Sequence, residues 1–170
     1  MTVRFKKLKA SVSTPAYAYG GDACFDLAVA IDNKDMKPMS VSGGVFAPLD
    51  AAVDKEGRCS FVVRPCEHIV FHTGLAFEIP EGHVMLVYAR SSTGIKSHLA
   101  LSNGTGVIDS GYRGEVRVAL TNTGIYPVKV TDGDRIAQAL IVPYPSVELV
   151  QADRLTNTQR GTGGIGSSGR

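Results

Sequence analysis

The sequence has few cysteines and little net charge. Cys24, Cys59 and Cys66 are odd in number, are not spaced as Cys-x-x-Cys and follow no cleavable apolar leader, so we expect a protein of the reducing cytoplasm. The 18 basic and 16 acidic residues are spread along the chain and leave a formal charge of +2. That distribution has no long basic stripe for duplex nucleic acid. We expect neither nucleic acid nor a membrane as partner, and any anionic ligand should be small.

Metal-ligand spacing is also scarce. His68 and His72 have the i, i+4 spacing of a helical zinc pair, but the surrounding segment CEHIVFHTGLAF alternates like a strand. In a strand that spacing separates the two side chains by roughly 13 Å. We therefore expect no zinc site at these two histidines.

Apolar residues are sufficient for one globular domain: they make up 44% of a chain of 170 residues. Nearly every periodic segment has period two. In EVRVALT, for example, Val116, Val118 and Leu120 share one face, and the polar residues Glu115, Arg117 and Thr121 share the other. Turn residues separate these segments at 80–82 (PEG), 122–124 (NTG), 132–134 (DGD) and 143–145 (PYP). Short strands at this rhythm predict an all-β sandwich or barrel.

Three segments depart from the strand pattern. A short helix is expected near RSSTGIKSH, where Ser91, Ser92 or Thr93 could cap a first turn whose free N–H groups point outward. Residues 32–60 show no clean periodicity and are interpreted as a long loop or inserted segment. From about residue 157 to residue 170, Gly, Ser and Thr dominate. We predict a β domain over 1–156 and a flexible arm over 157–170, mobile without ligand.

The arm carries Gly161, Gly163 and Gly166, which have the Gly-x-Gly-x-x-Gly spacing of phosphate-binding turns. In a dinucleotide-binding unit these glycines open a helix whose N-terminus holds the pyrophosphate. Only four residues follow Gly166 here, so a Rossmann interpretation is excluded by length.

Five separated segments, GDACFDL, YARSSTGIK, NGTGVIDSGYRG, GDRIAQ and RGTGGIGSSG, resemble in order and character the five motifs of the trimeric dUTPases. The resemblance covers residues 3–31 and 61–169. It implies a distorted jelly-roll β-barrel, a homotrimer with active sites shared between subunits, and Mg²⁺-assisted hydrolysis of dUTP to dUMP and pyrophosphate. That reaction limits uracil incorporation into DNA and supplies dUMP. The resemblance leaves a phage or viral source open, for which the host cytoplasm would be the location.

For the nucleoside, the resemblance makes Asp109 the carboxylate that positions the attacking water. This agrees with the chemistry, because attack on the α-phosphorus needs an acceptor for the water's proton. Tyr112 matches the tyrosine that lies against the deoxyribose. Asn103 matches the residue that reads uracil, together with main-chain groups of a turn formed by Gly106, Val107 and Ile108. Taken without the resemblance, Asp109 is an ordinary turn residue and Tyr112 a hairpin aromatic.

For the triphosphate, the resemblance implies contacts from Arg90, Ser91, Ser92, Gly94, Gln138, Arg160, Gly166, Ser167 and Ser168. Asp26 matches the acidic residue that supports Arg90 and the metal, which it contacts indirectly through water while the phosphates hold most of the Mg²⁺. Structural alternatives remain open: Asp26 and Arg90 could form a structural ion pair, and Gln138 could be an edge-strand amide.

Two positions depart from the family pattern. Ile165 stands where the family usually has Phe, so it can cover uracil by dispersion but not by stacking. In addition, 46 residues separate Asp26 from Thr73, with the surplus in 32–60. That segment is either inert decoration, which surface loops tolerate, or a protein-binding element.

Two other functions compete with dUTP hydrolysis. The related dCTP deaminases share the fold and the RSS motif, but they need a glutamate at the position that Ala119 occupies here. A β-sandwich interaction module would retain the motifs only as relics. Against that alternative, every polar ligand of the five motifs is present.

Overall fold

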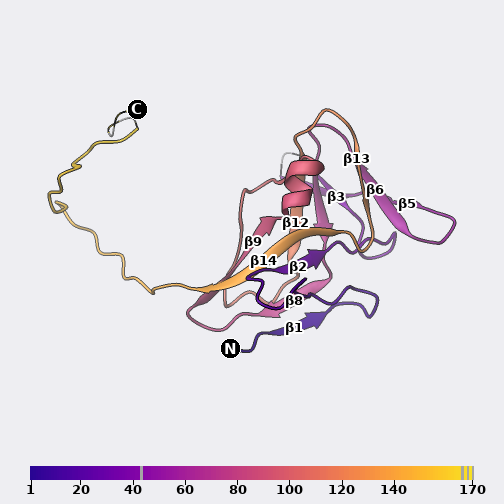
Figure 1. Ribbon diagram of the computed structural model, residues 1–170, viewed down its shortest axis with the longest axis horizontal. Coiled ribbons are helices and arrows are strands. Elements are labelled where there is room, and N and C mark those ends of the chain that lie inside the picture. Colours follow the sequence, from indigo (N-terminus) through magenta and orange to yellow (C-terminus); the bar gives the residue numbers. More distant parts are fainter. Residues whose placement is uncertain (43, 166, 168, 170) are drawn as a thin grey trace.

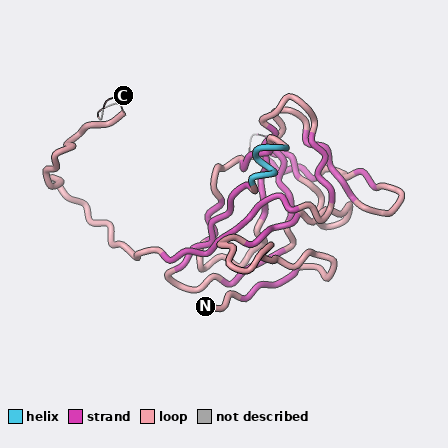
Figure 2. Tube along the Cα trace, in the orientation of Figure 1, coloured by secondary structure: helices cyan, strands magenta, loops and turns pink. Residues whose placement is uncertain are grey.

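The computed structural model describes residues 1–42, 44–165, 167 and 169. Apart from loops and turns, the described chain consists of β-strands and one short helix, as the sequence predicts (Figures 1 and 2). Its elements are β1 (Arg4–Lys7), β2 (Phe25–Ala28), β3 (Met39–Ser42), β4 (Val45–Pro48), β5 (Ala52–Val53), β6 (Cys59–Val63), β7 (His68–His72), β8 (Leu75–Glu78), β9 (His83–Ala89), η1 (Ser92–Lys96), β10 (Leu99–Leu101), β11 (Gly106–Ile108), β12 (Arg117–Asn122), β13 (Val128–Thr131) and β14 (Arg135–Pro143).

The strands pair in antiparallel ladders. The two larger sheets have the orders β10-β12-β7-β3-β4 and β11-β9-β14-β2, and smaller groups pair β13-β6-β5 and β1-β8. Because successive side chains of a strand point to opposite faces, each sheet turns one set of apolar residues inward. The fully buried Phe71, Leu27, Met85 and Leu120 come from four different strands and form the centre of the core.

Strand β12 shows the predicted alternation directly. Val116, Val118 and Leu120 are each at most 1% exposed. The same face continues to Asn122, a fully buried polar residue whose Nδ2 donates to the carbonyls of Val63 and Tyr126 at 2.9 and 2.8 Å. These bonds offset the cost of burying an amide in the core.

Part of residues 32–60, interpreted from the sequence as a long loop or inserted segment, forms regular strands. Strands β3 and β4 form a hairpin in register from Met39↔Pro48 to Ser42↔Val45, and β3 also pairs with β7. Residues 52–53 form β5, which pairs with β6. All four residues of β4 are exposed, so no alternation between buried and exposed positions marks this strand in the sequence.

Asp32 fixes the start of the inserted segment. Its Oδ1 accepts backbone N–H groups of Lys34, Asp35 and Met36 at 2.7–2.9 Å, and its Oδ2 pairs with Lys9. Burial raises the pKa of Asp32, but these hydrogen bonds outweigh burial and hold the pKa well below its usual range. The ionised carboxylate therefore ties the segment to the N-terminal part of the barrel.

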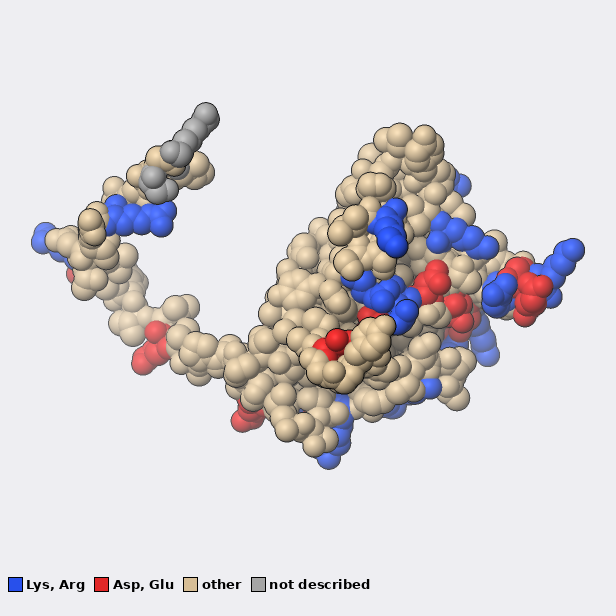
Figure 3. Space-filling view, in the orientation of Figure 1, with Lys and Arg blue, Asp and Glu red and all other residues tan. Residues whose placement is uncertain are grey.

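The chain leaves the barrel at the end of β14. Residues 144–165 extend away from the domain without a helix or strand, and most are exposed (Figure 1). On the face drawn in Figure 3, basic and acidic side chains are interspersed, in keeping with the absence of a basic stripe in the sequence. The one helix among the described residues is far too short to cross a membrane.

Candidate active site

The sheet β11-β9-β14-β2 carries most of the residues that the sequence singles out. Gln138 on β14 pairs with Tyr88 of β9 on one side and with Asp26 of β2 on the other. Arg90 directly follows the last residue of β9. The register thus brings Asp26, Arg90 and Gln138 together, although they are far apart in the sequence.

Asp26 is held between two arginines. Its Oδ1 accepts a bond from Arg90 Nε at 2.7 Å, and its Oδ2 accepts one from Arg135 Nη1 at 2.9 Å. Its side chain is 15% exposed, so the two guanidinium groups balance a largely buried charge. The sequence did not single out Arg135, although the residue lies within GDRIAQ. Gln138 donates Nε2 to the Ala89 carbonyl at 3.2 Å, so its side chain supports the neighbouring strand.

The short helix η1 follows Arg90. Ser91 and Ser92 are exposed there, and the Gly94 amide donates to the Arg90 carbonyl at 2.9 Å. Ser91, one of the three residues that could cap this helix, has helical backbone angles of φ −55° and ψ −42°, and its side chain makes no capping bond. The Ser92 hydroxyl accepts a long hydrogen bond from Arg90 Nη1 at 3.4 Å, which places it beside the guanidinium.

Asp109 and Tyr112 line a second part of the site. Asp109 follows β11, and a cavity of about 380 Å³ is lined by Val107, Ile108, Asp109, Tyr112, Glu115, Val116 and Arg117. The Tyr112 hydroxyl donates to the Glu115 carbonyl at 2.9 Å. The ring lies so close to Gly114 that a Cβ there would approach the hydroxyl to 2.5 Å. The loop of residues 109–115 thus has a defined fold around Tyr112.

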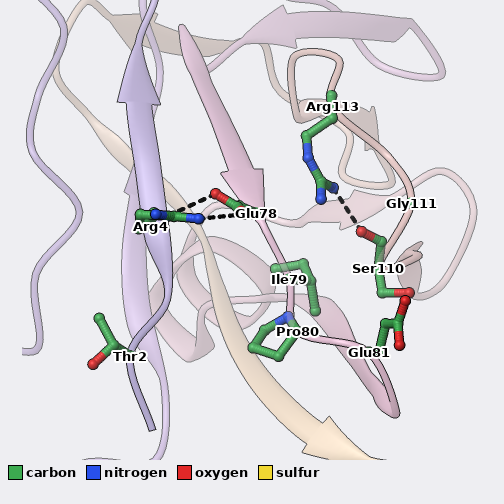
Figure 4. A pocket seen from close by; sticks show the side chains of 9 residues that line it. All are labelled: Thr2, Arg4, Glu78, Ile79, Pro80, Glu81, Ser110, Gly111 and Arg113. Carbon is green, nitrogen blue, oxygen red and sulfur yellow. Dashed lines mark hydrogen bonds and ion pairs between the residues drawn. The ribbon is translucent and has the colours of Figure 1, made fainter.

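Arg113 holds the same loop from another side. Its Nη1 donates to the Ser110 carbonyl at 2.6 Å and to the Tyr112 carbonyl at 3.1 Å. Figure 4 shows it in a cavity of about 550 Å³ beside the Arg4–Glu78 ion pair, which closes at 2.7 Å. This cavity is larger than the one at Asp109 but contains none of the site residues that the sequence predicts.

Asn103 lies in the turn that enters β11. The Gly104 amide donates to Leu101 and the Thr105 amide to Asn103, both to main-chain oxygens, and the Asn103 side chain is exposed. Gly106 then starts β11 at a point where a Cβ would lie 3.0 Å from Val87. The close approach of β11 to β9 therefore favours glycine here.

The two groups lie at opposite ends of β9. Ile108 pairs with Met85 and is followed by Asp109, whereas Arg90 is five residues beyond Met85. Asp109 lies one residue further from Arg90 than Ile108 does, level with Val84, so six residues at the rise of a strand separate Asp109 from Arg90 by about 20 Å along the sheet. One chain therefore does not bring the predicted water-positioning carboxylate next to the predicted phosphate-binding arginine.

The arm residues form a third group. Arg160 Nε donates to the Gly163 carbonyl at 2.9 Å, the Ser167 amide donates to Gly164, and Ile165 is fully exposed. Gly166 and Ser168, which the sequence also assigns to the site, lie outside the described residues.

Sequence reasoning missed a buried pair beneath the Asp109 loop. His72 Nδ1 lies 2.7 Å from Glu115 Oε2, and the two side chains are only 10% and 9% exposed. The alternation in EVRVALT placed Glu115 on the polar face, but the structure buries its carboxylate. His68 instead contacts Thr121 at 2.7 Å, and the described residues contain no cluster of three metal-ligating side chains.

Comparison with known proteins identifies relatives along the whole chain. The dUTPase family model matches residues 46–169. The deoxyuridine 5'-triphosphate nucleotidohydrolase of Desulfitobacterium hafniense (strain DSM 10664 / DCB-2) is 42% identical over 146 residues, covering 83% of this chain and 94% of that protein. The same enzyme of Hydrogenobaculum sp. (strain Y04AAS1) is 35% identical over 169 residues, with 99% of each chain covered.

The fold also matches a solved structure. The dUTPase of Staphylococcus bacteriophage 80alpha with dUPNHPP superposes with a TM-score of 0.75 at 26% identity, covering 99% of both chains. The sequence-based expectation of the dUTPase jelly-roll barrel is thereby confirmed. Family model, sequence relatives and fold agree, and the chain belongs to the dUTPase family.

Proposed function

We propose that this protein hydrolyses dUTP to dUMP and pyrophosphate, thereby limiting uracil incorporation into DNA and supplying dUMP for dTMP synthesis. Family membership and the nucleotidohydrolase relatives support this activity. The observation that carries the proposal for this chain is the cavity at the end of β11, which Asp109 and Tyr112 line together.

The base would bind at the edge of β11. This strand lies at the end of its sheet, so its outer side offers main-chain N–H and C=O groups that complement the edge of a pyrimidine. Asn103 precedes the strand and would help to read uracil, while close contact with Gly106, Val107 and Ile108 would reject the methyl group of thymine. The Tyr112 ring would lie against the deoxyribose and leave no room for a 2′-hydroxyl.

Asp109 would act as the general base. Its carboxylate is exposed to the cavity and can orient a water and accept its proton while the water oxygen attacks the α-phosphorus. A bond then forms between that oxygen and the α-phosphorus, the bond to the oxygen bridging the α- and β-phosphates breaks, and pyrophosphate leaves.

The phosphates would bind at Arg90, with Ser91, Ser92 and Gly94 of the η1 segment and Gln138 beside it. The donor set suits Mg²⁺ held mainly by the phosphates, which when bound neutralises their charge, because Mg²⁺ prefers few carboxylates and several waters. Each Asp26 oxygen accepts one arginine bond and keeps a lone pair, so Asp26 can support that ion through water.

The active site would be shared between subunits of a homotrimer. The separation of about 20 Å along β9 supports this, because a second copy must then supply Arg90 near Asp109. The arm, which contacts nothing on its own barrel in the described structure, would supply Arg160, Gly166, Ser167 and Ser168 to the phosphates and Ile165 to the base of a neighbouring site.

The activity is tested by pyrophosphate release from dUTP, dTTP, dCTP and UTP, with and without Mg²⁺. We expect efficient release from dUTP alone and a large loss when Mg²⁺ is chelated. Release of ammonia from dCTP, or no preference for dUTP, would contradict the proposal.

Replacing Asp109 with Asn should lower turnover of dUTP by about 10² to 10⁴, because the amide cannot accept the water's proton. The side chain keeps its shape, so binding of a non-hydrolysable dUTP analogue should change little. Near-normal turnover in D109N, measured by pyrophosphate release, would remove Asp109 from the proposed role.

Replacing Ile165 with Phe should tighten binding of the same analogue about two- to twelvefold, because stacking adds roughly 0.5–1.5 kcal/mol beyond burial. Calorimetry on the protein measures this gain, and Leu155→Phe, at a highly exposed apolar position just before the arm, is the control. If I165F binds no tighter than wild type, residue 165 does not face the base.

A further inference from the structure

The loop of residues 109–115 is attached to the barrel through Glu115. Asp109 and residues 111–114 are exposed, whereas the Glu115 carboxylate is 9% exposed. It accepts hydrogen bonds from three elements: His72 Nδ1 at 2.7 Å, the Gly74 amide at 2.8 Å and Arg117 Nε at 3.2 Å. Through these three bonds the Glu115 side chain connects the loop to β7, to the β7–β8 junction and to β12.

The attachment point is rigid. Gly74 links β7 to β8 at a φ of +64°, and a Cβ there would meet Val12 at 2.3 Å. The carbonyl of Gly74 accepts the Leu8 amide, and the neighbouring Val116 amide donates to Leu75, both at 2.8 Å. Because core residues surround this junction, Glu115 can move little while its carboxylate stays bonded.

Tyr112 depends on the same residue through the main chain. Its hydroxyl donates to the Glu115 carbonyl at 2.9 Å, and its ring covers Gly114. A shift of the Glu115 backbone would therefore move the acceptor that holds the tyrosine ring at the wall of the cavity.

The ionised form of Glu115 is the form that can accept the hydrogen bonds that attach the loop. Burial raises its pKa, but hydrogen bonds from His72 and the Gly74 amide outweigh burial and leave the pKa below its usual range. The groups that face the carboxylate are His72 from β7, the Gly74 amide and Arg117 from β12, all of them donors. An ionised carboxylate can satisfy all three, whereas an amide cannot.

We propose that Glu115 and His72 form a positioning pair that holds Tyr112 at the sugar wall of the cavity and so sets discrimination between deoxyribose and ribose. The proposal rests on dUTP hydrolysis as the function of this site. It gives a role to His72, which the metal-site reasoning left unexplained. Neither residue touches the reacting atoms, and both act through Tyr112.

The test compares kcat/KM for dUTP and UTP in Glu115→Gln. We expect the ratio to fall on the order of tenfold, because the amide cannot accept hydrogen bonds from His72, Gly74 and Arg117 together and so loosens the loop. Glu56→Gln removes the same charge from an exposed turn and should leave the ratio unchanged. Tyr112→Phe should lower the ratio too, and the double variant should lose less than the product of the single losses.

Hydrogen–deuterium exchange tests the attachment without activity. Amides of residues 109–114 should exchange faster in E115Q than in wild type or E56Q. If E115Q does not fold, His72→Phe takes its place, with a smaller effect in the same direction. The proposal would be overturned if E115Q left the dUTP/UTP ratio of kcat/KM unchanged, or lowered kcat/KM equally for both substrates. It would also be overturned if the losses in E115Q and Y112F multiplied fully in the double variant. Failure of the wild-type protein to hydrolyse dUTP would contradict the proposed function, whereas unchanged exchange in the variant would refute the attachment itself.

Discussion

Strand β9 lies within the sheet that positions most of the candidate site residues of the barrel. It pairs with β11 from Met85 to Val87 and with β14 along its whole length, and the Arg90 segment continues from its end. These ladders fix β11, Arg90 and Gln138, for which we propose roles in binding uracil and the phosphates, relative to one another to within the tolerance of a hydrogen-bonded sheet. The same pairing keeps Asp109 and Arg90 apart within one chain. The pairing of β9 therefore both orders the residues within each half of the site and separates Asp109 from Arg90 in one chain.

Each half of the site balances its own charge. Asp26 is neutralised by Arg90 and Arg135, which keeps an arginine in place for an anionic ligand at little cost in burial. In the other half, Arg117 pairs with the Glu115 carboxylate and His72 is hydrogen-bonded to it below the Asp109 loop. Asp109 itself stays exposed and without such a partner among the described residues, as a general base that must reach water requires. The ion pairs therefore hold the structure of the site, whereas Asp109 is left for the proposed chemistry.

Local patterns predicted the parts of the fold that alternate in burial. The apolar face of β12 and the strand character of His68–His72 followed from period two, and the five ordered motifs led to the family. The hairpin β3–β4 was not predicted, because its second strand is exposed on both faces and shows no alternation in burial. The burial of Glu115 was not predicted, because it depends on contacts with Gly74 and His72, about 40 residues away in sequence. No local pattern encodes those contacts. Likewise, no sequence pattern shows that Ser91 has helical backbone angles and that its side chain makes no capping bond.

The central claim is that one catalytic site takes Asp109 and Arg90 from different subunits, and subunit complementation measures this directly. D109N and Arg90→Ala are prepared as inactive homo-oligomers, denatured, mixed in equal amounts and refolded together. With random assembly, a shared site receives an intact Asp109 in half of cases and an intact Arg90 in half, so about a quarter of wild-type turnover per site should return. Activity that stays at the level of the separate variants, in mixed oligomers confirmed by native mass spectrometry, would show that each chain builds its site alone and would contradict the account.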